Sequence, residues 1–333
     1  MDVKISKGAN IKIKGSADRV YANHTESGFY ALKPTDFHSL IPKMVVREGD
    51  YVMAGDVLFN DKKNEKIKFT SPISGHVLEI KRGEKRKILE VKLQSDDEIK
   101  YKKFNLSAPD ELKRQDIIDF MLDSGLWPFI RQRPFSTIAD PSQQPKAIFI
   151  SAFDSAPLAP DNDFIFHGDN GLFQFGLDII TQLCNGVTHL NLDGNSNSNK
   201  VFREAKGVQI NNIFGPHPSG NVGVQIHHID PINKGDVVWY LSPQDVLTIG
   251  RCFRDKKYDV SKIIALTGPK VLKPRYYKVI SGSSIKGLVS ENTSKDQKRF
   301  ISGNVLTGQR IESDGFLGFY DSQITVIKEG NYS

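Results

Sequence analysis

The sequence predicts a multidomain α/β protein, and three observations support this expectation. The chain's 333 residues exceed the roughly 100–200 residues of one typical domain. A composition of 38% apolar and 25% charged residues is typical of folded proteins and excludes a wholly disordered chain. Short strands dominate the first and last parts, whereas strands alternate with helices in the middle. We therefore expect three domains, at residues 1–104, 105–257 and 258–333.

The first domain is predicted to be a barrel-sandwich. Apolar blocks between residues 45 and 93 alternate with glycine-containing turns such as Gly49-Asp50 and Ser74-Gly75. The segments Glu48–Leu58 and Ser71–Val77 are similar to the two halves of a biotinyl/lipoyl-like domain.

Carrier domains of that kind hold biotin or lipoate on a lysine of an exposed hairpin. In this sequence Asn64 occupies the position of that lysine. Lys62, Lys63 and Lys66 are close to it, but no Met-Lys-Met or Asp-Lys-Ala frame surrounds them. We therefore expect an unmodified scaffold, with a swinging carrier arm as the alternative.

The middle domain is predicted to be a Rossmann-like α/β domain. Ser107–Glu111 has the N-cap, proline and acidic residues of a helix start, and Gly125 is expected to end that helix. Apolar runs predict buried strands at Lys146–Ala152, Val187–Leu192 and Val237–Leu241. Strands that alternate with helices indicate a parallel sheet.

Two further helices are expected between and after these strands. One has a single apolar face, formed by Phe173, Leu177, Ile180 and Cys184, with Gly186 beyond its end. The other begins at the capping-box-like sequence Ser242–Asp245 and carries apolar residues at Val246, Ile249 and Phe253.

The last domain is predicted to be a small α+β or all-β module. Four short apolar runs predict strands, and glycines fall between them. The runs are Ile263–Leu266, Tyr276–Ile280, Leu288-Val289 and Ile324–Ile327.

A Rossmann-like sheet suggests a dinucleotide, but the phosphate-binding signatures are absent from the sequence. None of the 27 glycines has another glycine two residues later, which excludes the GxGxxG fingerprint. The loop Gly215–Gly220 has the glycine spacing of a P-loop, but Asn221 follows where a P-loop has lysine. We therefore expect a nucleotide-type fold without the parts that bind a nucleotide.

The two cysteines predict neither a disulfide framework nor an iron–sulfur or zinc site, because they are far apart and no CxxC occurs. Cys184 falls on an apolar helical face, where a buried inert thiol is usual. Cys252 lies near Arg251 and Arg254, which would lower its pKa, but a structural thiol is favoured. Such cysteine usage is typical of a reducing cytoplasm.

A group of histidines lies around residues 217–230. His217, His227, His228 and Asp230 are residue types that bind metals. His227 and His228 are adjacent on a predicted strand, so their side chains would point to opposite faces. We expect one of them to be buried and hydrogen-bonded and the other exposed, in preference to a metal site.

The segment 126–135 combines aromatic rings with two arginines, at Trp127, Phe129, Arg131, Arg133 and Phe135. Flat apolar groups beside hydrogen-bond donors suit a ring-bearing ligand such as a quinone, or a partner surface. The alternative is a packed helix-to-strand connection whose arginines cap carbonyl groups.

The net charge of +6 lies entirely within residues 1–103, since the remainder is neutral overall. Such a basic region can contact nucleic acid, an anionic membrane surface or an acidic partner. No zinc finger, RNP motif or continuous basic helix supports nucleic acid. No run approaches the roughly 18 uncharged apolar residues of a membrane-spanning helix, and no secretory signal begins the sequence.

Together these motifs resemble one family, the A subunit of the sodium-translocating NADH:quinone oxidoreductase. The resemblance covers essentially the whole chain. Its motifs are Lys4–Gly8, Lys33–Phe37, Glu48–Asp50, Ser71–His76, Gly125–Phe129, Arg133–Phe135, Gly215–Gly223 and His227–Pro231. The tail, Ile264–Tyr276 with Ser281-Gly282, is similar to the soluble-ligand-binding β-grasp module of that family.

The resemblance implies a peripheral subunit on the cytoplasmic side of a bacterial inner membrane, one of six subunits and not active alone. It implies a part in reducing quinone to quinol with electrons from NADH, coupled to Na⁺ export from the cytoplasm. FAD, FMN, riboflavin and iron–sulfur centres are implied on other subunits and none on this one. It also implies further helical sequence after Ser333, and a basic first domain that faces acidic partner subunits or lipid head groups.

The resemblance yields a set of expected site residues but no catalytic residue and no metal ligand. The residues expected to line a quinone-facing or docking surface are Trp127, Phe129, Arg131, Arg133 and Phe135. His217 is expected to donate to a quinone oxygen from the motif loop of Gly215, Pro216, Pro218 and Gly220. The alternative is a structural docking subunit that has no ligand site of its own.

Overall fold

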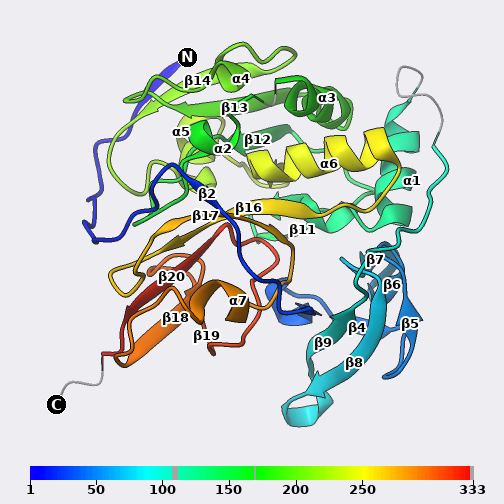
Figure 1. Cartoon of the computed structure of the whole chain (residues 1–333). Coiled ribbons are helices and arrows are strands. Elements are labelled where there is room, and N and C mark those ends of the chain that lie inside the picture. Colours follow the sequence, from blue (N-terminus) through cyan, green and yellow to red (C-terminus); the bar gives the residue numbers. More distant parts are fainter. Residues whose placement is uncertain (107–111, 169, 331–333) are drawn as a thin grey trace.

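The computed structural model describes residues 1–106, 112–168 and 170–330, whose strands form four sheets (Figure 1). Two small sheets come from the first domain, a seven-stranded sheet from the middle of the chain, and a six-stranded sheet from its C-terminal part. The α-helices of the described residues are α1 (Arg114–Ser124), α2 (Asn162–Ile165), α3 (Asn170–Thr181), α4 (Lys200–Arg203), α5 (Val222–Ile229), α6 (Pro243–Asp255) and α7 (Lys286–Val289).

The two small sheets form the predicted barrel-sandwich. One has the order β3 (Phe29–Leu32), β9 (Ile88–Ser95), β8 (Gly75–Arg82) and β5 (Tyr51–Val52). The other has the order β4 (Pro42–Met44), β6 (Val57–Asp61) and β7 (Asn64–Thr70). Alternate apolar residues of both sheets, such as Leu58, Phe69, Val77 and Leu93, are buried in one shared core.

The position expected for a carrier lysine lies at the hairpin between β6 and β7, where Asn64 begins β7. The turn itself is Lys62-Lys63. The backbone amide of Lys62 donates to the Ile41 carbonyl at 2.8 Å, and Nζ of Lys63 donates to the Ser39 carbonyl at 3.3 Å. The turn therefore lies against the preceding segment, and the unmodified scaffold stays a prediction.

The seven-stranded sheet has a parallel core, as the alternation of strands and helices predicts. Its order is β1 (Asp2–Lys4), β14 (Gln209–Phe214), β13 (Val187–Asp193), β12 (Ala147–Ser151), β15 (Val238–Leu241), β10 (Arg131–Arg133) and β11 (Thr137–Ile138). The first five strands are parallel, and β10 and β11 are antiparallel additions at one edge. Strand β14 is not predicted from the sequence because its polar residues, Asn211 and Asn212, interrupt the apolar pattern.

Helices cover both faces of this sheet (Figure 1). α3 and α6 pack against each other, and two glycines set their close approach: a Cβ on Gly176 would lie 2.3 Å from the Val246 carbonyl oxygen, and one on Gly250 would meet the Gly176 backbone. α5 covers the opposite face, where Ile226 packs with Phe149 and Tyr240. Such two-sided cover explains why the central strands are almost entirely apolar.

The first residues of the chain complete the sheets of the other two domains. β1 pairs in parallel with β14, and β2 (Tyr21–Ala22) pairs in parallel with β17 (Arg275–Ile280). The proposed first domain, residues 1–104, thus contributes one strand to each neighbouring sheet. Strands of three and two residues are too short to show an alternating apolar pattern, so the sequence does not predict these two pairings.

The six-stranded sheet has the order β19 (Gln309–Ile311), β18 (Lys298–Ser302), β20 (Gln323–Lys328), β16 (Ser261–Thr267), β17 and β2. Three of the four predicted strands lie within β16, β17 and β20. The strand predicted at Leu288-Val289 is wrong, because these residues end helix α7 and their amides donate to the Ile285 carbonyl. A run of two apolar residues is compatible with either a helical turn or a strand. Packing of this run against the six-stranded sheet determines that it is helical.

Helix ends follow the predicted signals where they are described. Gly125 ends α1 in the left-handed conformation with φ of 80°, and Ser242 and Asp245 form the reciprocal capping box of α6. The predicted helix start at 107–111 lies outside the described residues, and α1 begins at Arg114. Over the described parts of the chain, no helix has the length and apolar character needed to cross a bilayer.

Candidate functional site

A pocket of about 220 Å³ opens at the carboxyl ends of β12 and β15. The strand that follows β12 in the chain, β13, lies on one side of β12, whereas β15 lies on its other side. The strand order therefore reverses between β12 and β15. Ligands of parallel α/β sheets typically bind at such a point. The cavity, which we call the junction pocket, is lined by the start of β10, the ends of β12 and β15, the starts of α5 and α6, and residues 320–322.

Arg131 forms one wall of the junction pocket. β10 pairs antiparallel with β15, which places Arg131 opposite Tyr240. The guanidinium lies between two aromatic rings, 4.5 Å from the Tyr240 centroid and 4.1 Å from the Tyr320 centroid. Its Nε is buried and has no hydrogen-bond partner among the described residues. Stacking on both faces holds the planar cation in place while part of its donor set stays unused.

Tyr320 and Asp245 position this arginine further. The Tyr320 hydroxyl donates to the Pro128 carbonyl at 2.6 Å, so the ring is fixed at both ends. Asp245 is held by its capping box, in which the Ser242 amide donates to its carboxylate at 2.8 Å. Burial raises the pKa of the Asp245 carboxyl, and the positive charge of Arg131 opposes that rise.

Lys262 supplies a second, half-buried cation. Its Nζ donates to the Phe319 carbonyl at 2.8 Å. Burial lowers the pKa of Lys262 to about 8, although the carboxylates of Asp321, Asp245 and Asp36 favour its charged form. The junction pocket thus combines the Arg131 guanidinium with a lysine ammonium whose pKa is lowered to about 8.

The motif loop at Gly215–Gly220 lies beside this pocket and is fixed to the N-terminal segment. A Cβ on Gly215 would lie 2.1 Å from the Ile5 carbonyl oxygen, and a Cβ on Gly8 would lie 2.0 Å from that of His217. The His217 amide donates to Asn10 Oδ1 at 2.9 Å. The two motifs Lys4–Gly8 and Gly215–Gly223, far apart in sequence, therefore form one packed unit.

His217 and Gly220 share one serine. His217 Nδ1 lies 3.0 Å from Ser155 Oγ, and the Gly220 amide donates to the same oxygen at 2.8 Å. A Cβ on Gly220 would lie 2.4 Å from the Ser155 amide nitrogen, so only glycine fits. Gly220 lines the junction pocket, whereas His217 does not line it and contacts Ser155.

The structure separates the five residues predicted in segment 127–135. Trp127 is fully buried, its Nε1 donates to the Ala139 carbonyl at 2.7 Å, and its ring meets Trp239 edge-on. Phe129 is buried against Phe319. Both residues belong to the hydrophobic core, and neither lines the junction pocket.

The other three residues of that segment reach the surface to different degrees. Arg131 lines the junction pocket, whereas Arg133 lies 5.2 Å from the Tyr240 centroid and next to Gly223 at the start of α5. Phe135 is 75% exposed. Quinone contact by any of these residues stays a prediction.

Three wall residues of the pocket, Tyr240, Lys262 and Tyr320, are not expected from the sequence. They belong to β15, β16 and the segment before β20, and only the packing of two sheets brings them to Arg131. No local signal marks them, since each lies in an ordinary apolar run. The local signals at this site are Arg131 among aromatic residues, the closely spaced glycines of the Gly215–Gly220 loop and the Ser242–Asp245 capping box.

The prediction for the adjacent histidines is wrong. His227 and His228 lie on helix α5, and both are exposed. Their rings meet edge-on at 5.1 Å, and His228 Nδ1 lies 2.8 Å from the Val224 carbonyl. The apolar residues Val222, Ile226 and Ile229 have the spacing of one helical face, and this pattern indicates a helix where a strand was expected.

The remaining metal-ligand and thiol candidates have structural surroundings. Asp230 forms an ion pair with Lys146 at 2.6 Å. Both cysteines are buried, and burial raises the pKa of Cys252 to about 12, as expected of a structural thiol. Within the described residues, no group of three or more histidine, cysteine or acidic side chains is arranged to hold a metal ion.

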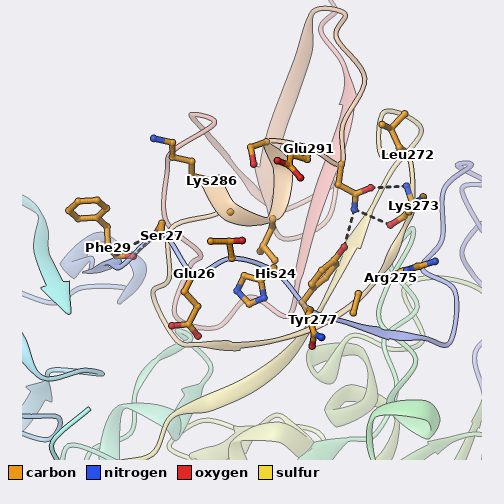
Figure 2. A pocket seen from close by; sticks show the side chains of 17 residues that line it. His24, Glu26, Ser27, Phe29, Leu272, Lys273, Arg275, Tyr277, Lys286 and Glu291 are labelled. Carbon is orange, nitrogen blue, oxygen red and sulfur yellow. Dashed lines mark hydrogen bonds between the residues drawn. The ribbon is translucent and has the colours of Figure 1, made fainter. Parts of the chain in front are cut away.

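A second and larger cavity of about 940 Å³ lies where residues 22–29 cross the C-terminal module (Figure 2). His24 meets Tyr277 edge-on at 5.8 Å, and a Cβ on Gly287 would lie 1.8 Å from the Thr25 carbonyl oxygen. Figure 2 shows acidic and basic side chains around it, among them Glu26, Arg275, Lys286 and Glu291. This mixture of charges selects no single class of ligand.

Similarity to known protein families follows the same three parts of the chain. Residues 3–96 match the model of the NqrA N-terminal barrel-sandwich hybrid domain, residues 112–258 that of the NqrA second alpha/beta domain, and residues 263–313 that of the NQRA C-terminal domain.

Curated relatives match over almost the whole chain. The A subunit of the Na(+)-translocating NADH-quinone reductase of Photorhabdus laumondii is 34% identical over 331 residues, which are 98% of this chain and 74% of the relative. The protein of the same name from Yersinia pseudotuberculosis serotype O:1b is 35% identical over 332 residues, with the same shares. The chain therefore spans about three quarters of the length of these relatives.

Among solved structures, the chain is similar to part of an NAD⁺-reducing [NiFe]-hydrogenase in the air-oxidized state. The TM-score is 0.45 at 13% identity, over 65% of this chain and 47% of that one, which is too slight a likeness to define the fold. The three domain matches and the identity to curated relatives agree with one another, and the chain therefore belongs to the family of the A subunit of the Na⁺-translocating NADH-quinone reductase.

Proposed function

We propose that this chain is a peripheral subunit of a Na⁺-translocating NADH:quinone oxidoreductase and takes part in reducing quinone to quinol, coupled to Na⁺ export. The names of its relatives support membership of that complex. One observation supports the quinone: Arg131, stacked between Tyr240 and Tyr320, faces a pocket at the carboxyl ends of parallel strands.

The junction pocket suits a quinone head group in size and in chemistry. A cavity of about 150 Å³ holds benzene, so about 220 Å³ accommodates one ring with small substituents. Quinone carbonyl oxygens accept hydrogen bonds, and Arg131 and Lys262 are donors at this pocket. The isoprenoid tail would extend outside, since the pocket has no room for it.

In this proposal the chain binds and orients quinone, and the electron carriers lie elsewhere. Arg131 would polarise one carbonyl oxygen, and the aromatic walls would stack on the ring. Flavins and iron–sulfur centres would reside on other subunits. The chain would lie on the cytoplasmic side of the bacterial inner membrane, in contact with those subunits.

The finer fold labels and the domain boundaries belong to the same proposal. The order β14-β13-β12-β15 is the 3-2-1-4 order of doubly wound sheets, which supports a Rossmann-like label for residues 105–257. We assign residues 258–333 to a β-grasp module because α7 packs on its mixed sheet.

The second candidate is a docking role without a ligand site. It is favoured by the burial of Trp127 and Phe129 and by the structural contacts of His217, since these account for three predicted site residues without any ligand.

Quinone-analogue binding to the purified chain separates the two candidates. We expect Arg131→Gln to weaken binding about tenfold or more, because it removes a charged donor and its stacking. Arg133→Ala and His217→Ala test the flanking positions, and Arg203→Gln, an exposed arginine of α4, serves as the matched control. Equal affinity in all four variants and the unaltered chain would leave docking without a ligand as the function.

A further inference from the structure

The barrel-sandwich domain carries an exposed basic surface that the proposed quinone site does not use. It consists of Arg82 and the loop Gly83–Lys87 of the β8–β9 hairpin, together with the turn Lys62-Lys63 of the β6–β7 hairpin, and we call it the tip patch. Residues 81–87 contain five cations and one acid, Glu84. Figure 1 shows the β8–β9 hairpin extending away from the two large sheets.

The cations of the tip patch outnumber its single acid, Glu84. Its cations are exposed, and none of them forms an ion pair with any residue in the described ranges. By contrast Lys81, one residue earlier, pairs with Glu90 at 3.5 Å, and Lys43 pairs with Glu65. Unpaired, solvent-exposed cations at one end of a domain produce a local positive field.

Two of these cations occupy unfavourable backbone positions. Lys85 and Arg86 have φ of 53° and 59°, at the centre of a hairpin loop where glycine or asparagine is usual. Successive non-glycine residues at positive φ cost stability, so the loop presents these two cations at a cost to folding.

An apolar hollow of about 340 Å³ lies directly beside the cations. Leu40, Ile41 and Ile88 contribute to it, and Arg82, Arg86 and Lys87 line its rim. Ile41 is 48% exposed. The backbone hydrogen bond from Lys62 to Ile41 joins the second hairpin to the same surface.

We propose that the tip patch binds the anionic head groups of a lipid bilayer, with Ile41 inserted at the boundary between head groups and acyl chains. Uncompensated cations around exposed aliphatic groups are the combination that binds anionic membrane interfaces. A projecting hairpin tip can reach a flat surface without a shaped partner. This inference rests on the proposed peripheral location and adds a contact made by this chain itself.

The test is flotation of the purified chain with vesicles of phosphatidylcholine alone and with about 30% phosphatidylglycerol added. We expect binding only to the anionic vesicles, falling as salt is raised from about 50 to 500 mM. Lys85→Gln/Arg86→Gln/Lys87→Gln removes three charges, and affinity should fall about hundredfold, since each cation near an anionic leaflet contributes about fivefold. Lys200→Gln/Arg203→Gln/Lys206→Gln, the same residue types exposed on the middle domain, should bind normally.

A second variant and a second assay separate the outcomes. Ile41→Ser should weaken vesicle binding at unchanged charge, which a purely electrostatic association would not show. Loss of binding in the middle-domain triple variant, or equal binding to neutral vesicles, would overturn the proposal. So would a chain that assembles with membrane subunits but ignores anionic vesicles, because the basic surface would then serve an acidic protein partner. Failure to co-purify with membrane subunits, by contrast, would contradict the peripheral location itself.

Discussion

The junction pocket and the tip patch use charge in opposite ways. At the pocket, Arg131 and Lys262 are held by rings, carbonyls and carboxylates from segments far apart in sequence. At the tip patch, Lys85 and Arg86 come from one loop and face solvent. The charges at the pocket depend on the whole fold, and removing them from water affects its stability. The side-chain charges of the tip patch come from two neighbouring hairpins and, being exposed, contribute little to stability.

The largest expected effect concerns the loop that supports the pocket. Gly215→Ala places a Cβ 2.1 Å from the Ile5 carbonyl oxygen at a φ of 142°, so we expect a loss of about 3–5 kcal/mol in unfolding free energy. Gly171→Ala in α3 is the control, because nothing lies within 4 Å of its Cβ and alanine favours helix; it should stabilise slightly. Denaturant unfolding measures both, and equal stabilities would contradict the close packing of the two motifs.

The next effect is the pH dependence that Lys262 contributes to stability. Burial lowers the pKa of Lys262 to about 8 from an ordinary 10.5, so the unfolded chain binds more protons than the folded chain between these values. The unfavourable contribution of this lysine is therefore complete below pH 8 and disappears as the pH rises toward 10.5.

Lys262→Met removes the titrating group. We expect the difference in unfolding free energy between the unaltered chain and this variant to change by about 3 kcal/mol between about pH 7 and 10.5. Lys206→Met, at an exposed lysine, is the matched control. A difference that stays constant with pH would show that Lys262 is not buried as a charge.

A smaller effect tests the aromatic wall of the pocket. Tyr320→Leu removes one of the two rings that stack on Arg131, and a quinone analogue should bind about fivefold more weakly. Tyr320→Phe keeps the ring and loses only the bond to Pro128, so its affinity should stay near that of the unaltered chain. Equal losses in both variants would assign the effect to the hydroxyl.

The smallest effect completes the comparison. Neutralising Lys85, Arg86 and Lys87 together should change the unfolding free energy by less than about 0.5 kcal/mol, because these side chains make no ion pairs with the described residues. Thermal unfolding checks this expectation. A large change in either direction would show that the tip patch contributes to the fold.

The sequence alone determined the three-part organisation, the family, the central strands and the helix ends at Gly125 and Ser242. These features follow from local periodicity, from capping chemistry and from motifs that are contiguous in the chain. It also identified Arg131 and the Gly215–Gly220 loop, because an arginine among aromatic residues and closely spaced glycines are visible locally.

Only the tertiary structure decided which of these residues line the junction pocket. Trp127 and Phe129 are core residues and Tyr240, Lys262 and Tyr320 are wall residues because sheets from two domains pack together there, and no window of sequence contains that packing. Likewise β1 and β2 join sheets more than 200 residues away, and His227 and His228 lie on a helix. Short elements take their conformation from long-range pairing, since their own pattern is too brief to specify it.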